Sequence, residues 1–166
     1  MIAFLRIGAV EISPQPAPPV PTAATPAPTT ATEPAELRGL AGATTLAAAQ
    51  RVAGYPIRLP HYPTTIGPPD RVYLQDLGGP VVVLAWLDPA APEHVLFALH
   101  QLPPNSFAQK FQPEVLETTT VHGQMAIWTQ GPYLMQFRAA SGEPIFETRR
   151  LVDQHALIWA QGEMTY

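Results

Sequence analysis

The chain has 166 residues, of which 21 are proline and none is cysteine, and it carries a net charge of −4 with only 13% charged residues. The lack of cysteine excludes a disulfide framework and cysteine-ligated zinc. The nine Lys and Arg residues form no large basic cluster, which argues against nucleic acid as a partner, because phosphate binding needs clustered cations.

Residues 1–12 (MIAFLRIGAVEI) form an apolar segment that is shorter than the ~20 residues needed to span a bilayer. Two interpretations stay open: a short amphipathic helix or unordered start, or the juxtamembrane remainder of a membrane anchor. Residues 13–40 are rich in Pro, Thr and Ala, which predicts a disordered, extended linker. The remaining residues, 41–166, are predicted to form one β-rich globular domain.

A short helix is predicted near residues 44–53, with Thr44 or Thr45 as its N-cap and Gly54 as its stop. Its apolar face is expected to lie on the sheet. That face consists of Leu46, Val52 and the alanines between them.

Residues 55–70 contain five prolines and are predicted to be an ordered, extended loop, because proline disfavours both helix interiors and central strands. His61 and Tyr62 in this loop are candidate site residues. The favoured interpretation is that they pack the loop against the sheet.

Three strands are predicted in the middle of the chain, at residues 71–77, 81–87 and 94–102. A hairpin turn at Gly78-Gly79 joins the first two. The second strand reads VVVLAWL without polar alternation, so we expect it to be central and covered on both faces. His94 and His100 share one face of the third strand, but they lie about 20 Å apart, too far to share a metal.

From residue 114 onward, short runs of β-formers alternate with turns of two to four residues, which is typical of an antiparallel meander. The expected strands are 114–121, 124–130, 133–138, 144–152, 155–160 and 163–166. A two-residue hairpin at His122-Gly123 predicts that Val121 opposes Gln124 and that Thr118 opposes Ile127. Because the chain ends within a strand, we expect the natural chain to continue.

The predicted fold class is α+β: a mostly antiparallel β meander of about eight to ten strands, with a short N-terminal helix packed on one face. Between the third strand and the meander, Asn105 or Ser106 is predicted to cap a brief helical turn at residues 107–111.

No HExxH, GxSxG, GxGxxG or Walker A motif occurs. The carboxylates of the second half are spread along the sequence: Glu114, Glu117, Glu143, Glu147, Asp153 and Glu163. Glu147 and Arg149 are interpreted as part of a solvated polar face with Arg138 and Gln136. We therefore predict no catalytic residue, no cofactor and no metal ligand, and hence no enzyme.

Three tryptophans lie in the middle of β runs, at Trp86, Trp128 and Trp159. One interpretation is that they fill the core, which we favour. The other is that they line an apolar ligand cavity, together with Tyr133.

Three segments resemble an uncharacterised bacterial extracytoplasmic domain: Pro56–Pro89, the GPYL turn at Gly131–Leu134, and Glu147–Tyr166. That domain is found C-terminal to the membrane anchor in zinc-finger anti-sigma-factor-like proteins of Chloroflexi-type bacteria. The resemblance covers roughly residues 40–166. This chain contains neither the cysteine-based zinc-binding module nor the polar stretch and final helix of that family.

The resemblance implies a non-enzymatic extracytoplasmic sensor or scaffold domain of a membrane-anchored anti-sigma-type regulator. Its expected partners are other envelope proteins or an apolar ligand. Its membrane association is expected through a segment absent from this chain. The alternative is a module that binds lipid or another apolar ligand in a tryptophan-lined cavity.

Overall fold

The computed structural model describes residues 5–17, 34–104, 106–139 and 141–166. These residues divide into two compact units. Unit 1 contains residues 5–17, 77–79, 102–104, 106–139 and 141–166, and unit 2 contains residues 34–76 and 80–101. This grouping differs from the expected division at 12 and 40, because strands near the start of the chain share unit 1 with the C-terminal strands. Much of the expected linker, at 18–33, lies outside the described residues.

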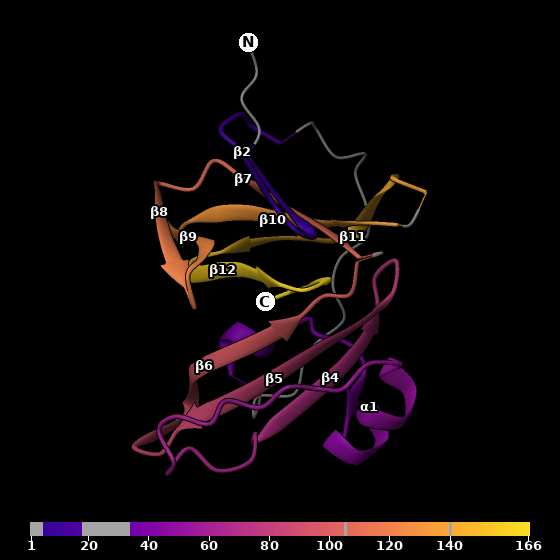
Figure 1. The fold of residues 1–166 in the computed structure, drawn as a ribbon, viewed down its shortest axis with the longest axis vertical. Coiled ribbons are helices and arrows are strands. Elements are labelled where there is room, and N and C mark those ends of the chain that lie inside the picture. Colours follow the sequence, from indigo (N-terminus) through magenta and orange to yellow (C-terminus); the bar gives the residue numbers. More distant parts are fainter. Residues whose placement is uncertain (1–4, 18–33, 105, 140) are drawn as a thin grey trace. The chain divides into compact units, whose positions relative to one another are not determined.

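Unit 2 is a four-stranded antiparallel sheet with the order β3-β4-β5-β6 and one α-helix (Figure 1). Its elements are η1 (Ala35–Leu37), β3 (Ala43–Thr44), α1 (Leu46–Ala53), β4 (Arg71–Asp76), β5 (Pro80–Asp88) and β6 (Ala91–Gln101). The hairpin turn joining β4 and β5 is confirmed, since Asp76 pairs with Pro80 and Gly78 has a positive φ of 80°.

The ends of α1 lie where the sequence predicts. Thr45 accepts a hydrogen bond from the Ala48 N–H at 3.2 Å, and Gly54 ends the helix with a φ of 76°. The buried face differs from the expected one: Ala49 and Ala53 are buried, whereas Val52 is 65% exposed. The face follows the spacing of three and four residues that a helix requires, and Val52 lies off that stripe.

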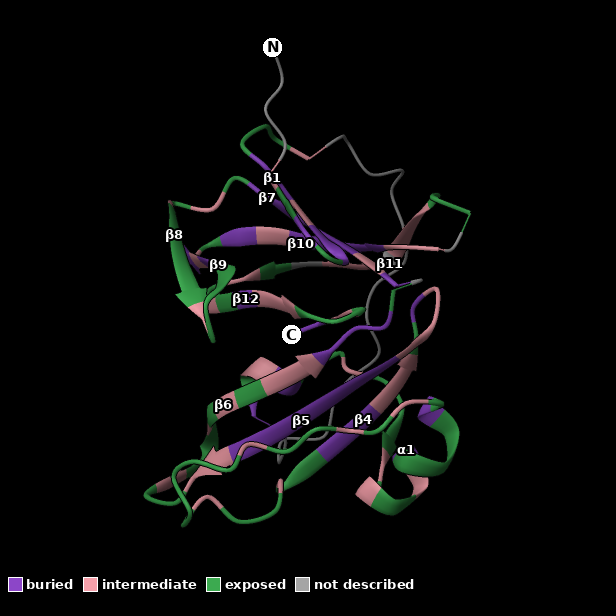
Figure 2. Cartoon of the chain, viewed as in Figure 1, coloured by how far each residue is buried: buried purple, intermediate pink, exposed green. Residues whose placement is uncertain are grey.

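The strand β5 is the core of unit 2, and its prediction as a central strand is confirmed. Its residues 81–86 are all buried, so both faces of the strand are covered (Figure 2). On one face lies a cluster formed by Ala49, Ala53, Val72, Val82, Leu84 and Trp86.

Unit 1 contains two sheets (Figure 1). The first has the order β1-β2-β7-β10-β11, with the strands β1 (Leu5–Ile7), β2 (Val10–Ser13), β7 (Phe107–Phe111), β10 (Tyr133–Arg138) and β11 (Pro144–Val152). The second has the order β13-β12-β9-β8, with the strands β13 (Met164–Thr165), β12 (Ala156–Gln161), β9 (Gln124–Gln130) and β8 (Val115–Val121).

The predicted β-rich fold with antiparallel sheets and one short helix is confirmed, but a single meander is wrong. Consecutive strands β9 and β10 belong to different sheets, as do β11 and β12. The chain crosses between the sheets at two corners that touch: a Cβ on Gly131 would lie 2.9 Å from the Val152 carbonyl oxygen. The described residues form thirteen strands, more than the eight to ten expected, and include one parallel pair, β2 with β7.

The β8–β9 hairpin agrees with its predicted register. Val121 pairs with Gln124 and Thr118 pairs with Ile127. The turn residues His122 and Gly123 have φ values of 51° and 75°, as a two-residue turn of this type requires.

Two local predictions are wrong, because tertiary pairing overrides local preference in both places. The described part of residues 1–12 is a β-hairpin turning at Gly8, whose φ is 50°, and not a helix or an unordered start. Residues 107–111 are strand β7 rather than a helical turn. β7 lies between β2 and β10 and takes its hydrogen bonds from those two distant strands.

Thr165 joins three distant parts of unit 1. Its backbone N–H and C=O bond to Leu102 at 2.9 and 2.8 Å, and its hydroxyl accepts a 2.7 Å hydrogen bond from the Ala9 N–H. The residue is fully buried, and a Cβ on Gly8 would collide with its Oγ1. The C-terminal strand thus holds the N-terminal hairpin in place.

Replacing Thr165 by valine keeps the shape but leaves the buried Ala9 N–H without its acceptor. We expect Thr165→Val to lower the free energy of unfolding by about 1–3 kcal/mol, measured by urea denaturation. Thr119→Val, at an exposed position on β8, is the matched control and should change it little. Equal stability of the two variants would contradict the role given to Thr165.

Candidate functional site

Two of the predicted site residues, Trp128 and Trp159, share one face of the second sheet of unit 1. Trp159 pairs with Ala126, and Trp128 pairs with Leu157. Directly paired residues point to the same face of a sheet, and alternate residues along a strand do so as well. We name the face formed by Ala126, Trp128, Leu157 and Trp159 the tryptophan face.

Each of the two tryptophan rings contacts a neighbouring aromatic ring, which holds it in position. The Trp159 ring stacks on Tyr166, with centroids 5.3 Å apart and planes 17° apart, and the two residues exchange backbone hydrogen bonds. The Trp128 ring lies 5.7 Å from the His155 ring. Ala126, which pairs with Trp159 and lies two residues before Trp128 on β9, is fully buried. Both indoles are half-buried, and Leu157 is 38% exposed. The tryptophan face therefore presents ordered aromatic rings that remain partly accessible to solvent.

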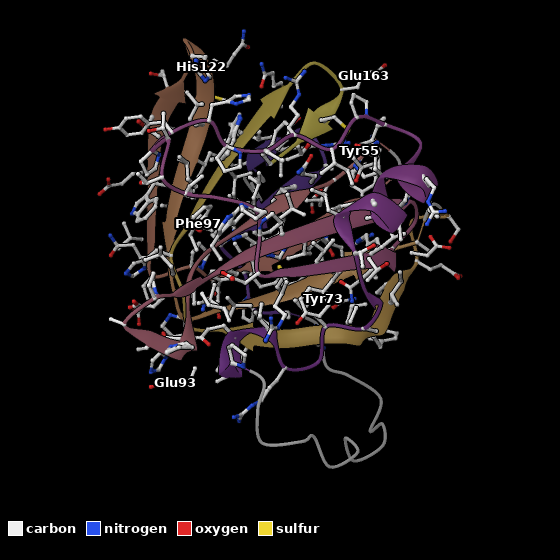
Figure 3. The ribbon with its side chains drawn as sticks, turned by 90° about the horizontal axis from the view of Figure 1, so that it is seen from below. Tyr55, Tyr73, Glu93, Phe97, His122 and Glu163 are labelled. Carbon is white, nitrogen blue, oxygen red and sulfur yellow. The ribbon has the colours of Figure 1, made fainter. Side chains whose placement is uncertain are left out.

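A pocket of about 180 Å³ opens beside Trp159. It lies between the β8–β9 turn and the β12–β13 turn, and its lining includes His122, Gln124, Gln161 and Gly162. Figure 3 labels His122 and Glu163, which mark these two turns. Polar groups of the turns thus border an aromatic wall, an arrangement that suits a ligand with one polar and one apolar part.

The other two candidates, Trp86 and Tyr133, do not line this pocket. Trp86 is 3% exposed in the core of unit 2, where its ring stacks on Phe97 at 4.6 Å and its Nε1–H donates to the Gly67 carbonyl at 3.2 Å. Tyr133 is 4% exposed on β10 in unit 1. Trp86 thus belongs to unit 2, whereas Trp128, Trp159 and Tyr133 belong to unit 1.

Beside Tyr133 lies a residue that the sequence reasoning missed. Lys110, the only lysine of the chain, is 5% exposed on β7, and its Nζ lies 3.9 Å from the centroid of the Tyr133 ring. Burial lowers the pKa of its ammonium to about 7. The local sequence predicts a helical turn at residues 107–111 and gives no sign of the pairing with β2 and β10 that buries Lys110.

The candidates in the proline loop do not pack as expected: His61 is exposed and Tyr62 is 87% exposed. The loop is instead held by Gln101, whose side chain bonds both the N–H and the C=O of Arg58. Tyr55 also contributes, because its hydroxyl lies 2.7 Å from the Pro80 carbonyl oxygen; Figure 3 labels it near α1.

The remaining histidines are dispersed. His94 Nδ1 lies 3.5 Å from Glu36 Oε1, and the His94 side chain is 64% exposed. Among the described residues, no group of three or more His, Cys, Asp or Glu side chains could hold a metal ion.

No family model, no curated protein and no solved structure matches this chain. In the part of the chain that the structure describes, no helix is both long enough and apolar enough to cross a membrane.

The buried Lys110 predicts a specific pH dependence of stability. Between pH 7 and about 10.4 the unfolded chain binds a proton that the folded chain does not, so stability should rise with pH by about 1.4 kcal/mol per unit. Below pH 7 Lys110 is protonated in the folded chain too, so the free energy of unfolding is reduced by the full cost of burying its charge. Lys110→Met should therefore be more stable at pH 7 and lose this slope.

The measurement is urea denaturation of both proteins from pH 6 to about 10, with the difference between them plotted against pH. Arg51→Met, which removes one exposed positive charge from α1, is the control and should keep the slope. A difference independent of pH would show that the ammonium of Lys110 is not desolvated.

Proposed function

We propose that this chain is a non-enzymatic binding domain and that the tryptophan face with its adjoining pocket binds an apolar ligand. Following the resemblance of residues 56–89, 131–134 and 147–166, we place it on the extracytoplasmic side of a membrane-anchored anti-sigma-type regulator, as a sensor or scaffold. The observation that carries the binding role is the pair of half-buried tryptophans on one face, next to an open pocket.

The energetics favour an amphiphile as the ligand. Each methylene that leaves water for the tryptophan face contributes about 0.8 kcal/mol, so a short alkyl chain across Trp128, Leu157 and Trp159 supplies several kcal/mol. The stacked partners Tyr166 and His155 hold the indoles in position, which lowers the entropy lost on binding. A polar head group would lie at the pocket, where Gln124 and Gln161 offer donors and acceptors.

A regulator role also needs partners and an anchor. Other envelope proteins are the proposed partners, and a segment outside this chain is the proposed anchor. The scaffold part of the proposal is supported by the extensive strand pairing within each unit, which gives a rigid surface for presentation.

Titration with dodecyl maltoside below its critical micelle concentration tests the tryptophan face. We expect the tryptophan fluorescence of the full chain to change and saturate, and we expect Trp159→Ala to lose at least about tenfold in affinity. Trp86→Phe removes the core fluorophore and should leave the titration intact.

Leu96→Ala is the matched apolar control, because Leu96 is 58% exposed on β6 and should not affect binding. If a panel of detergent monomers and lysolipids leaves the fluorescence unchanged, or if Trp159→Ala binds like the wild type, the binding proposal fails.

The placement in a regulator has its own test. The 166 residues correspond to 18.0 kDa, so a protein expressed from its native locus as part of an anchored regulator should be heavier and sediment with membranes. Immunoblotting of fractionated cells measures both properties. A species of this mass found only in the soluble fraction would contradict the anchored regulator and leave the binding role to the titration.

A further inference from the structure

A row of polar side chains crosses the first sheet of unit 1. Arg6 pairs with Glu11, Glu11 with Gln109, and Gln109 with Gln136, so the four residues stand side by side on β1, β2, β7 and β10. Residues paired in this way lie about 5 Å apart and point to the same face. Gln109 Nε2 donates to Glu11 Oε1 at 2.9 Å. We call these four residues the polar row.

The centre of the polar row is buried, although the sequence predicted a solvated face for Gln136. Gln136 is only 1% exposed and Gln109 6%. Both line a pocket of about 210 Å³, together with Glu11, Ser13, Phe111 and Arg138. This volume is several times the roughly 30 Å³ that a water molecule occupies in the liquid.

Hydrogen-bonding groups at this pocket lack partners. Gln136 Oε1 and Arg138 Nε, both from residues that line the pocket, are buried and make no hydrogen bond. Arg138 does donate from Nη1 to the Gly142 carbonyl at 3.0 Å, which fixes its guanidinium. A buried hydrogen-bonding group that is left unpaired costs folding stability, and a charged one costs more. Such a cost is typical of a site that a ligand completes.

The unpaired groups define what the ligand must carry. Arg138 needs an anionic oxygen, and a planar guanidinium is matched by a carboxylate. Gln136 Oε1 needs a donor, and the carboxylate of Glu11 in the same pocket favours a positively charged one. A dianion such as phosphate would be repelled by Glu11, and a neutral sugar would leave Arg138 without its anion. Phe111 supplies an apolar wall.

We propose that this pocket binds a small zwitterion of the free α-amino-acid type. The carboxylate binds Arg138, the ammonium binds Gln136 Oε1 and Glu11, and the side chain lies against Phe111. The pocket is built on a different sheet from the tryptophan face, so this site is independent of the apolar-ligand proposal.

The test is isothermal titration calorimetry of the full chain with L-alanine, L-valine and L-glutamate. Two blocked analogues of L-valine serve as control ligands. N-acetyl-L-valine lacks the ammonium, and L-valinamide lacks the carboxylate. We expect at least one amino acid to bind, and we expect each blocked analogue to bind at least about tenfold more weakly than L-valine.

Gln136→Leu separates a binding role from a structural one. It removes the buried unpaired oxygen, so the melting temperature of the free protein should stay the same or rise while amino-acid affinity falls at least about tenfold. Arg138→Gln should weaken binding similarly, whereas Arg71→Gln, which removes an exposed charge in unit 2, should not.

No saturable binding of any amino acid up to about 10 mM would overturn the proposal. So would blocked analogues that bind as tightly as L-valine, or Gln136→Leu with unchanged affinity. Trp159→Ala should keep amino-acid binding, so a failure here and a failure at the tryptophan face can be told apart.

Discussion

The buried threonine near the C-terminus is the contact on which unit 1 depends. Thr165 bonds to Leu102 through its backbone and to Ala9 through its hydroxyl, so one residue connects the segment entering unit 1, the last strand and the N-terminal hairpin. These partners are up to 156 positions apart in sequence. With Ala9 held, β2 lies beside β7, and only then does the polar row exist. The two sheets and one of the two candidate sites therefore depend on the same short contact.

Strand β7 buries polar or charged side chains on both of its faces, which is costly for folding stability. One of its faces buries Lys110 over the Tyr133 ring, and the other buries Gln109 against Glu11. A cation over an aromatic face recovers part of the desolvation cost, about 0.5–2 kcal/mol, but burial still lowers the pKa of Lys110. Apolar residues at these positions would give a more stable sheet, and polar groups retained at such a cost are typical of functional surfaces.

Local features of this fold could be predicted from the sequence, and nonlocal ones could not. The Thr45 cap, the Gly54 stop, the buried run of β5 and the register at His122-Gly123 are each set by a few adjacent residues. The parallel pairing of β2 with β7 is not, since it joins segments about 98 residues apart whose own pattern also suits a helix. The tryptophan face illustrates the limit: alternation places Trp128 on one side of β9, but a meander would pair β9 with β10 rather than with β12.

Ligand binding at the pocket beside the polar row also affects how stably strand β2 is docked on β7. Its lining comes from β2 through Glu11 and Ser13, and from β7 and β10 through Gln109 and Gln136. A ligand held across these strands binds only the state in which β2 is docked, so its binding free energy adds to the stability of that docking. The pocket lining therefore ties the N-terminal hairpin to β7 and β10 more tightly when a ligand is bound.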